Sequence, residues 1–346
     1  MLLRELDSNE RPPGYEPGEL PTAPSRDVQT VCFLFASAKV ERIFETTKYC
    51  GDFCSKDGDF FKKTRAGRDF RLENLSFTEK ESKLKTFDKH IQTSIAMQIL
   101  LADAKTMKTD MTQTTDRLPR FEALARALAD EMAEADVDDL KADLKCSAAI
   151  AAGAQKAFRQ FATTPPCRAL LAYDGTAYKH LQAGGMSRGS MAFADEHLWI
   201  TTFMYGLLRP ADGIRPYRVA PSVQLAASDG LPLGRFWRSL LTPTLIGAAR
   251  QDDGVLLHLS TTEYEQLFDW RELKQSLRIV QPRFLVRQGD KLSVQAVWAK
   301  ACRGAMVRFV CDNQITRPED LPAFTYEGFV YDTAASTADV PVFVRG

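Results

Sequence analysis

The stretch of residues 205–218, YGLLRPADGIRPYR, crowds three arginines and two prolines into fourteen positions and contains one acid. Because proline fixes the backbone dihedral φ and cannot continue a helix, the two prolines predict a rigid corner. Arginines at such a corner either cap the last carbonyls of a helix or bind an anion. We expect Arg209 and Arg218 to bind an anion there, and Arg215 to face the solvent.

Other polar residues lie at the predicted ends of helices and strands, where α/β sheets commonly bind their ligands. A carboxylate beside lysine or arginine suits acid–base chemistry, whereas several cations on one surface suit phosphate binding. The acid–base candidates are Asp174, Tyr178, Glu263 and Tyr264. The candidates for binding an anion or a nucleic acid are Lys39, Arg209, Arg218, Lys300, Arg303 and Arg308, of which Lys39 and Lys300 are predicted to follow strands.

The familiar motifs of nucleotide and metal sites are absent from the sequence. It contains no GxGxxG, GxxxxGK[ST], HExxH or CxxC pattern. The four histidines are scattered, and the seven cysteines have no regular spacing, with Cys50 and Cys54 as the only close pair. We therefore expect no metal and no cofactor, and reduced thiols in a cytoplasmic protein.

The composition allows a large core and excludes a strong overall charge. The chain has 346 residues, 45% of them hydrophobic, and its 45 basic residues balance 45 acidic ones. Segment 281–311 nevertheless carries six bases against one acid, enough for a basic face. No run approaches the roughly 20 apolar residues of a membrane-spanning helix. Residues 1–29 lack the apolar core of a signal peptide, so we expect them to be a disordered tail.

Hydrophobic patterns predict helices mainly in the first half of the chain and strands mainly in the second. An apolar run at 30–39 is typical of a buried strand, and Thr78 and Glu81 form a capping box before a predicted helix that extends to about Met107. The other predicted helices are 118–135, 138–161, 193–210 and 303–313, and the other predicted strands are 254–264, 277–286, 291–300, 327–332 and 340–345. This order favours an α+β fold, a mixed α/β architecture with a mixed sheet, over a regular βαβ array.

Seven segments resemble, in their order and spacing, the YaaA family of peroxide-stress proteins. They are FASAKVER, LLAYDGTAYKHLQA, FMYGLLRPADGIRPYR, RFWRSLLT, LSTTEY, AKACRGAMVRFV and FTYEGFVYD. The resemblance covers residues 30–39 and about 114–346. It implies a compact single domain with a mixed sheet, surrounding helices, and a basic cleft with a helix-hairpin-helix-like element. It also makes 30–346 the YaaA-like domain and 41–113 an insertion, and it places Phe203 where the family has glycine.

Two functional hypotheses follow. The resemblance implies a DNA-binding protein of the hydrogen peroxide response, which limits oxidative damage by reducing unincorporated iron. In that hypothesis the cationic candidates contact phosphates of double-stranded or distorted DNA, and we expect a monomer without membrane contact. The alternative is an enzyme that acts on a nucleotide or another small anionic substrate in the same cleft, because DNA binding does not require the carboxylate and tyrosine candidates. A closed pocket would favour the enzyme, and an open groove would favour DNA binding.

Overall fold

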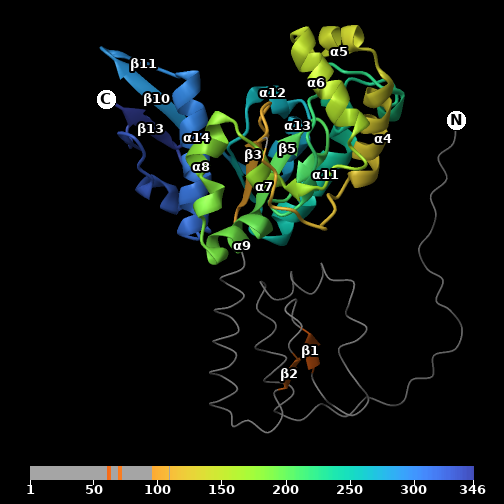
Figure 1. The fold of residues 1–346 in the computed structure, drawn as a ribbon. Coiled ribbons are helices and arrows are strands. Elements are labelled where there is room, and N and C mark those ends of the chain that lie inside the picture. Colours follow the sequence, from red (N-terminus) through yellow and green to blue (C-terminus); the bar gives the residue numbers. More distant parts are fainter. Residues whose placement is uncertain (1–60, 64–68, 72–95, 109) are drawn as a thin grey trace, which may run out of the picture. The chain divides into compact units, whose positions relative to one another are not determined.

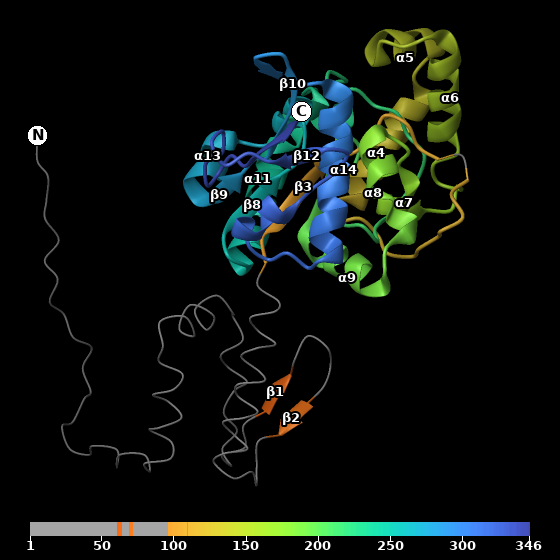
Figure 2. The same cartoon turned by 90° about the vertical axis from the view of Figure 1, so that its left-hand side faces the viewer.

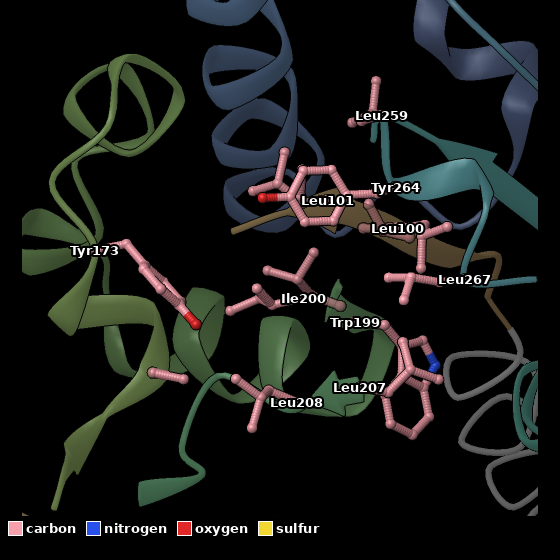
Figure 3. Close-up of a cluster of buried hydrophobic side chains, with 14 of the residues drawn as sticks. Leu100, Leu101, Tyr173, Trp199, Ile200, Leu207, Leu208, Leu259, Tyr264 and Leu267 are labelled. Atoms are coloured by element: carbon pink, nitrogen blue, oxygen red, sulfur yellow. The ribbon is translucent and has the colours of Figure 1, made fainter. Parts of the chain in front are cut away.

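Strand β3 (Gln98–Ala102) lies in the middle of a five-stranded sheet, and all five of its residues are buried. The order of this sheet is β6-β5-β3-β8-β9, with β5 (Leu198–Thr202), β8 (Val255–His258) and β9 (Arg278–Val280) parallel to β3 and β6 (Gly206–Leu208) antiparallel at one edge. A central parallel strand is covered on both faces, which explains why the sequence QILLA is apolar without alternation. Figure 3 shows Leu100 and Leu101 of β3 and Ile200 of β5 within one buried cluster.

The computed structural model describes residues 61–63, 69–71, 96–108 and 110–346. The first two ranges belong to one unit of the chain, Met1–Thr86, in which β1 (Phe61–Lys63) pairs antiparallel with β2 (Asp69–Arg71). The other ranges belong to a second unit, Phe87–Gly346, and Figure 1 shows its helices and sheets. The expected tail at 1–29 and the expected strand at 30–39, with Lys39, lie outside the described residues.

The position of β3 corrects two expectations. The predicted helix from Thr78 to Met107 is wrong at its end, since residues 98–102 form a strand, while residues 78–95 lie outside the described part. A short apolar run fits either structure by its spacing, and burial on both faces decides for the strand. Segment 41–113 therefore cannot be an insertion over its whole length, because it includes the central strand of the sheet.

A group of helices follows β3, and its first members match the predicted ones. α4 (Glu122–Glu134) falls within the predicted helix 118–135, while the predicted helix 138–161 is divided into α5 (Val137–Leu144) and α6 (Ala148–Arg159). Lys145 ends α5 in the left-handed conformation, and the Ser147 hydroxyl caps α6 by accepting a hydrogen bond from the Ile150 backbone N–H. The helix-hairpin-helix-like element stays unconfirmed.

Short elements continue the chain toward β5. They are β4 (Cys167–Arg168), α7 (Ala169–Ala172), α8 (Thr176–Leu181), η2 (Ala183–Gly185) and α9 (Arg188–His197). The predicted helix at 193–210 is wrong after His197, because 198–208 form the antiparallel hairpin β5–β6. Phe203 is accommodated in the turn of this hairpin, where Gly206 takes the positive φ of 71° and Phe203 itself does not.

The last third of the chain completes the first sheet and builds a second one. Before β9 lie β7 (Gly213–Ile214), η3 (Ala226–Ser228), α10 (Leu233–Phe236), α11 (Arg238–Gln251), α12 (Thr262–Glu265) and α13 (Trp270–Ser276). After it come β10 (Arg283–Gln288), β11 (Lys291–Ser293), α14 (Ala296–Asp312), η4 (Pro318–Ala323), β12 (Phe329–Tyr331) and β13 (Val342–Arg345). The second sheet has the order β11-β10-β13-β12, with parallel and antiparallel pairs, so the expected mixed α/β fold is confirmed.

Helix α14 connects α8 with the second sheet. It packs against α8 and also contacts β10, as Figures 1 and 2 show. Because β11 ends at Ser293, the predicted strand 291–300 is wrong beyond that residue. The predicted short helix at 303–313 begins earlier, at Ala296. Close packing of α14 on α8 depends on Gly304, because a Cβ atom there would lie 1.8 Å from the backbone oxygen of Ala177.

We expect the substitution Gly304→Ala to lower the free energy of unfolding by about 1–3 kcal/mol or more, because α8 cannot yield at a backbone atom without a shift of the helix. Thermal or urea unfolding measures the change. Gly247→Ala in α11 is the matched control, since a Cβ there meets nothing within 4 Å. That substitution should leave stability unchanged or raise it by about 0.4–1 kcal/mol. Equal effects of the two substitutions would contradict the assigned helix contact.

Candidate functional site

The connections of the sheet define a crevice between β3 and β8. In the chain order of this sheet, β3 is followed by β5 on one side, whereas β8 is followed by β9 on the other. Where successive connections leave in opposite directions, the carboxyl ends of the two strands separate and usually bind a ligand. Asp103 follows β3, and Glu263 and Tyr264 lie in α12 directly after β8. The crevice is therefore lined with polar and titratable side chains.

Asp103 is the centre of a hydrogen-bond network of tyrosines. The Tyr264 hydroxyl donates to its Oδ1, and the Tyr217 hydroxyl donates to its Oδ2 at 2.5 Å. The hydroxyls of Tyr217 and Tyr173 are 2.8 Å apart. Since Tyr217 uses its only proton on the carboxylate, Tyr173 is the donor in this pair. Nearby, the Tyr178 hydroxyl donates to the backbone oxygen of Ala102 at 2.9 Å.

The environment makes Asp103 titrate near neutral pH and keeps the tyrosines neutral. Burial raises the pKa of Asp103 from 3.8 to about 6, although the hydrogen bonds from Tyr217 and Tyr264 act in the opposite direction. Burial, with the charge of Asp103 next in size, raises the pKa of Tyr173, Tyr217 and Tyr264 well above 10. Asp103 can therefore exchange a proton at physiological pH, while the phenols act as hydrogen-bond donors.

A cavity of about 290 Å³ opens above this carboxylate. Its charged lining residues are Asp103, Lys105, Lys145, Arg218 and Glu263, so cations exceed acids when Asp103 is neutral and also when it is ionised. Lys105 and Glu263 form an exposed ion pair at 3.4 Å, and the Arg218 guanidinium donates to the backbone oxygen of Lys105 at 3.2 Å. Among the described residues, neither Lys145 nor Arg218 has a carboxylate within 4.0 Å. Such a lining favours an anionic ligand.

A second cavity, of about 200 Å³, is lined by Tyr173, the hydrogen-bond partner of Tyr217. Tyr173 and Tyr178 line it together with Lys108, Asp174 and Lys179. Lys179 and Asp174 form an exposed ion pair at 3.5 Å. Like the first cavity, this one has one more cation than carboxylates.

The structure divides the acid–base candidates between these two cavities. Tyr264 and Glu263 line the first, and Asp174 and Tyr178 line the second. Sequence reasoning missed Asp103 and Lys105, because it assigned their segment to a helix. Lys105 takes the place after the central strand that was expected for Lys39 after the first strand. The signal was present, since a run of five buried residues followed by Asp and Lys is typical of a strand that ends at a ligand crevice.

The arginines of the proline corner have three different environments. Arg218 lines the first cavity. Arg209 instead donates to the backbone oxygen of Leu198 and to the side chain of Gln98, and its guanidinium lies 3.4 Å from the ring centroid of Trp199. This geometry favours a role of Arg209 in holding backbone carbonyls over a role in binding an anion. Asp212 accepts the Arg209 backbone N–H at 2.8 Å, which closes the corner.

The expectation that Arg215 faces the solvent is wrong. Arg215 is 6% exposed, and its guanidinium pairs with the Glu122 carboxylate at 2.9 Å. It also donates to the backbone oxygen of Thr164 at 3.0 Å, and its backbone N–H donates to the Tyr205 hydroxyl. A buried charge needs such partners, so Arg215 ties the corner to α4.

The remaining cationic candidates lie on α14 and line neither cavity. Arg308 pairs with Asp312 and donates to the backbone oxygens of Gln182 and Gly185, at 2.8 and 2.9 Å. Arg303 is half-buried, and this burial lowers its pKa. Lys300 is exposed within the helix and does not follow a strand. The structure thus brings Arg218 alone, among the cationic candidates it describes, to the tyrosine network.

The described residues can be searched for metal ligands, for disulfides and for a membrane-spanning helix. Within them, no cluster of three His, Cys, Asp or Glu side chains could hold a metal ion. Their cysteines, Cys146, Cys167, Cys302 and Cys311, are free thiols, while Cys50 and Cys54 lie outside the described residues. No helix of the described part has the length and apolar character needed to cross a membrane.

Comparison with known proteins agrees with this description. The model of the family described as "Peroxide stress protein YaaA" matches residues 97–335, a range that begins one residue before β3. A UPF0246 protein of Bacteroides thetaiotaomicron is 40% identical over 256 residues, which cover 72% of this chain and 99% of the relative. UPF0246 proteins of Parabacteroides distasonis and Phocaeicola vulgatus are 36% and 34% identical, covering 72% and 70% of this chain and 100% and 96% of the relatives.

We expect Arg209→Lys to lower the free energy of unfolding by about 1–3 kcal/mol, because lysine cannot stack on Trp199 while it donates to both oxygen partners. Arg218→Lys is the matched control and should change stability by about 0.5 kcal/mol or less, since its guanidinium makes a single exposed hydrogen bond to backbone. Thermal unfolding of the two variants separates these roles. Equal stability of both variants would show that Arg209 does not build the corner.

The pKa of Asp103 predicts a pH dependence of stability that Asp103→Asn removes. Because the folded-state pKa of about 6 lies above 3.8, the folded protein binds more protons between these values, and its stability falls as pH rises through this window. Between low pH and a pH above 6, the free energy of unfolding of the wild type should fall by about 2–3 kcal/mol more than that of Asp103→Asn. Urea unfolding at pH 4, 5, 6 and 7 measures it. Parallel curves for the wild type and Asp103→Asn would contradict the raised pKa.

Proposed function

Because the chain belongs to the YaaA family of peroxide stress proteins, we propose that it serves the peroxide response as an enzyme that acts on a nucleotide or another small phosphate-bearing anion. The observation that carries this proposal is the position of Asp103. Its carboxylate is held by two phenol hydroxyls at the base of a cation-lined cavity of about 290 Å³, at the switch point of the sheet. Such a cavity suits a small molecule better than a duplex.

The cations of the cavity would bind the phosphate. Arg218 and Lys145 have no carboxylate partner within 4.0 Å among the described residues, so they remain available to a ligand. Lys105 would exchange its partner Glu263 for the phosphate at little cost, because an exposed ion pair contributes about 0–1 kcal/mol. An Arg–phosphate contact provides two parallel donors, and a lysine provides a mobile point charge.

Asp103 would move a proton at the bound substrate. With its pKa of about 6, the carboxylate is mostly ionised at neutral pH and can accept a proton from a substrate O–H or N–H group. Tyr217 and Tyr264 hold its two oxygens, which fixes the direction in which the carboxylate can act. The protonated Asp103 would then return the proton to the substrate or to solvent water, so that the network ends in its original state.

DNA binding is the second candidate function, and the cations of the two cavities support it. Lys105, Lys108, Lys145, Lys179 and Arg218 line the two cavities, and DNA phosphates could bind along their mouths. In this candidate the protein would act as a monomer in the cytoplasm and limit iron-dependent oxidative damage. Arg209 and Arg308 contribute less than expected, because their guanidinium groups already bond to protein oxygens.

Affinity for 5′-AMP and for a duplex of about 20 base pairs, each at two salt concentrations, distinguishes the two candidates. We expect 5′-AMP to bind at one site, and Lys105→Ala to weaken it about tenfold through the loss of a phosphate contact. The control is Lys291→Ala, an exposed lysine of β11 that lines neither cavity. It should bind 5′-AMP like the wild type.

Binding of the duplex in place of 5′-AMP would contradict the proposed enzyme. If the duplex binds with a steep salt dependence while 5′-AMP does not bind, DNA binding replaces the proposed enzyme activity. If Lys105→Ala and Lys291→Ala weaken 5′-AMP equally, the ligand is not held in the cavity around Asp103. Thermal unfolding of each variant checks that a lost affinity does not come from a lost fold.

A further inference from the structure

We propose that the two cavities form one extended site for a nucleotide that carries two separate phosphate groups, with Lys108 and Lys179 binding the second phosphate. This inference rests on the proposed function, since it extends the cavity around Asp103 into the neighbouring one. The shared chemistry is a pair of phosphates joined through a nucleoside. A nucleoside bisphosphate and a short single-stranded phosphodiester both supply it.

One loop supplies residues to both cavities. Asp103 and Lys105 line the first cavity, and Lys108, only three residues further, lines the second. The loop is fixed by backbone hydrogen bonds on both sides of Met107. The Lys108 N–H donates to the Ala172 oxygen at 2.8 Å, and the Asp174 N–H donates to the Thr106 oxygen at 2.9 Å. The backbone positions of Lys105 and Lys108 are therefore fixed relative to each other.

A hydrogen-bonded pair of tyrosines contributes one residue to each cavity. Tyr217 lines the first cavity and Tyr173 lines the second, and their hydroxyl oxygens are 2.8 Å apart. The two cavities thus approach each other at the network that holds Asp103. A substrate that reaches over this pair places its reacting group beside the carboxylate and one phosphate on each side.

The charges of the two cavities match two anionic groups better than one. The first cavity has Lys105, Lys145 and Arg218 against two carboxylates, and the second has Lys108 and Lys179 against Asp174. Each cavity keeps an unbalanced positive charge. A ligand with a single phosphate neutralises one of them and leaves the other unfilled. Among the described residues, Lys108 has no carboxylate within 4.0 Å and is free to contact a ligand.

Calorimetric titration of the full chain with three probes tests this inference. The probes are 5′-AMP, adenosine 3′,5′-bisphosphate and the 5′-phosphorylated dinucleotide pApA. We expect the wild type to bind adenosine 3′,5′-bisphosphate or pApA about tenfold more tightly than 5′-AMP, because each carries a second phosphate group that makes a further charge-assisted contact. Tighter binding of pApA would assign a phosphodiester, and tighter binding of the bisphosphate would assign a nucleoside bisphosphate.

The variants separate this inference from the proposed function. Lys108→Ala should reduce the affinity ratio between the preferred probe and 5′-AMP to about one, whereas Lys105→Ala should weaken all three probes, and Lys291→Ala should keep the wild-type ratio. Equal binding of all probes by the wild type, with the Lys105→Ala effect intact, would overturn the extended site and leave the proposed function standing. If no probe binds, both fail. Thermal unfolding confirms that each variant is folded.

Discussion

The hydrogen bonds from Tyr217 and Tyr264 to the Asp103 carboxylate are the interaction on which the arrangement of the crevice depends. A carboxylate removed from water costs several kcal/mol unless charge-assisted hydrogen bonds replace its hydration. Buried phenols have the converse need of an acceptor. The carboxylate and the phenols therefore satisfy one another, and a partial network would be less stable than either a complete one or an apolar replacement.

This network fixes the relative positions of segments that are distant in the sequence. Asp103 ends the central strand, Tyr264 comes from α12 and Tyr217 comes from the proline corner, while Tyr173 adds the end of α7. Each segment must reach the same carboxylate within hydrogen-bond distance. As a result, the cations beside the tyrosines in sequence are carried to the same crevice, as Arg218 is by its neighbour Tyr217.

The proline corner shows how a charged sequence is divided between architecture and the crevice. Arg215 and Glu122 neutralise each other below the corner, and Arg209 is held against Trp199 with Asp212 beside it. These contacts stabilise the fold and occupy the guanidinium groups of Arg215 and Arg209. Arg218, the last arginine of the stretch, is the one that reaches the cavity. Residue type alone could not separate them, because a buried paired arginine and a ligand-binding arginine differ only in what surrounds them.

The sequence was sufficient for the fold class, the family resemblance and many elements, because periodicity and turn residues are local properties. It failed where tertiary burial decides. QILLA of β3 and LWITT of β5 were assigned to helices, although the first is a continuous apolar run and the second is rich in β-formers, and the long α14 was divided into a strand and a helix. The misassigned β3 had the largest consequence, because it hid Asp103 and Lys105. Glu263 and Tyr264 were found because the predicted strand 254–264 includes β8, although its last residues form α12 and not strand.

The cations that line the cavity together with Asp103 constrain the chemistry that the crevice can support. An ionised carboxylate repels a phosphate, and a neutral one does not, so anion binding and the protonation of Asp103 favour each other. With a pKa of about 6 in the empty cavity, a bound phosphate would raise the value further and bring it closer to neutral pH. The charge of Lys105 opposes this shift, because it favours the ionised form, whereas the charge of Glu263 raises the pKa of Asp103 as the phosphate would. The balance between the ligand's charge and Lys105 therefore decides how far the pKa of Asp103 rises when the substrate binds.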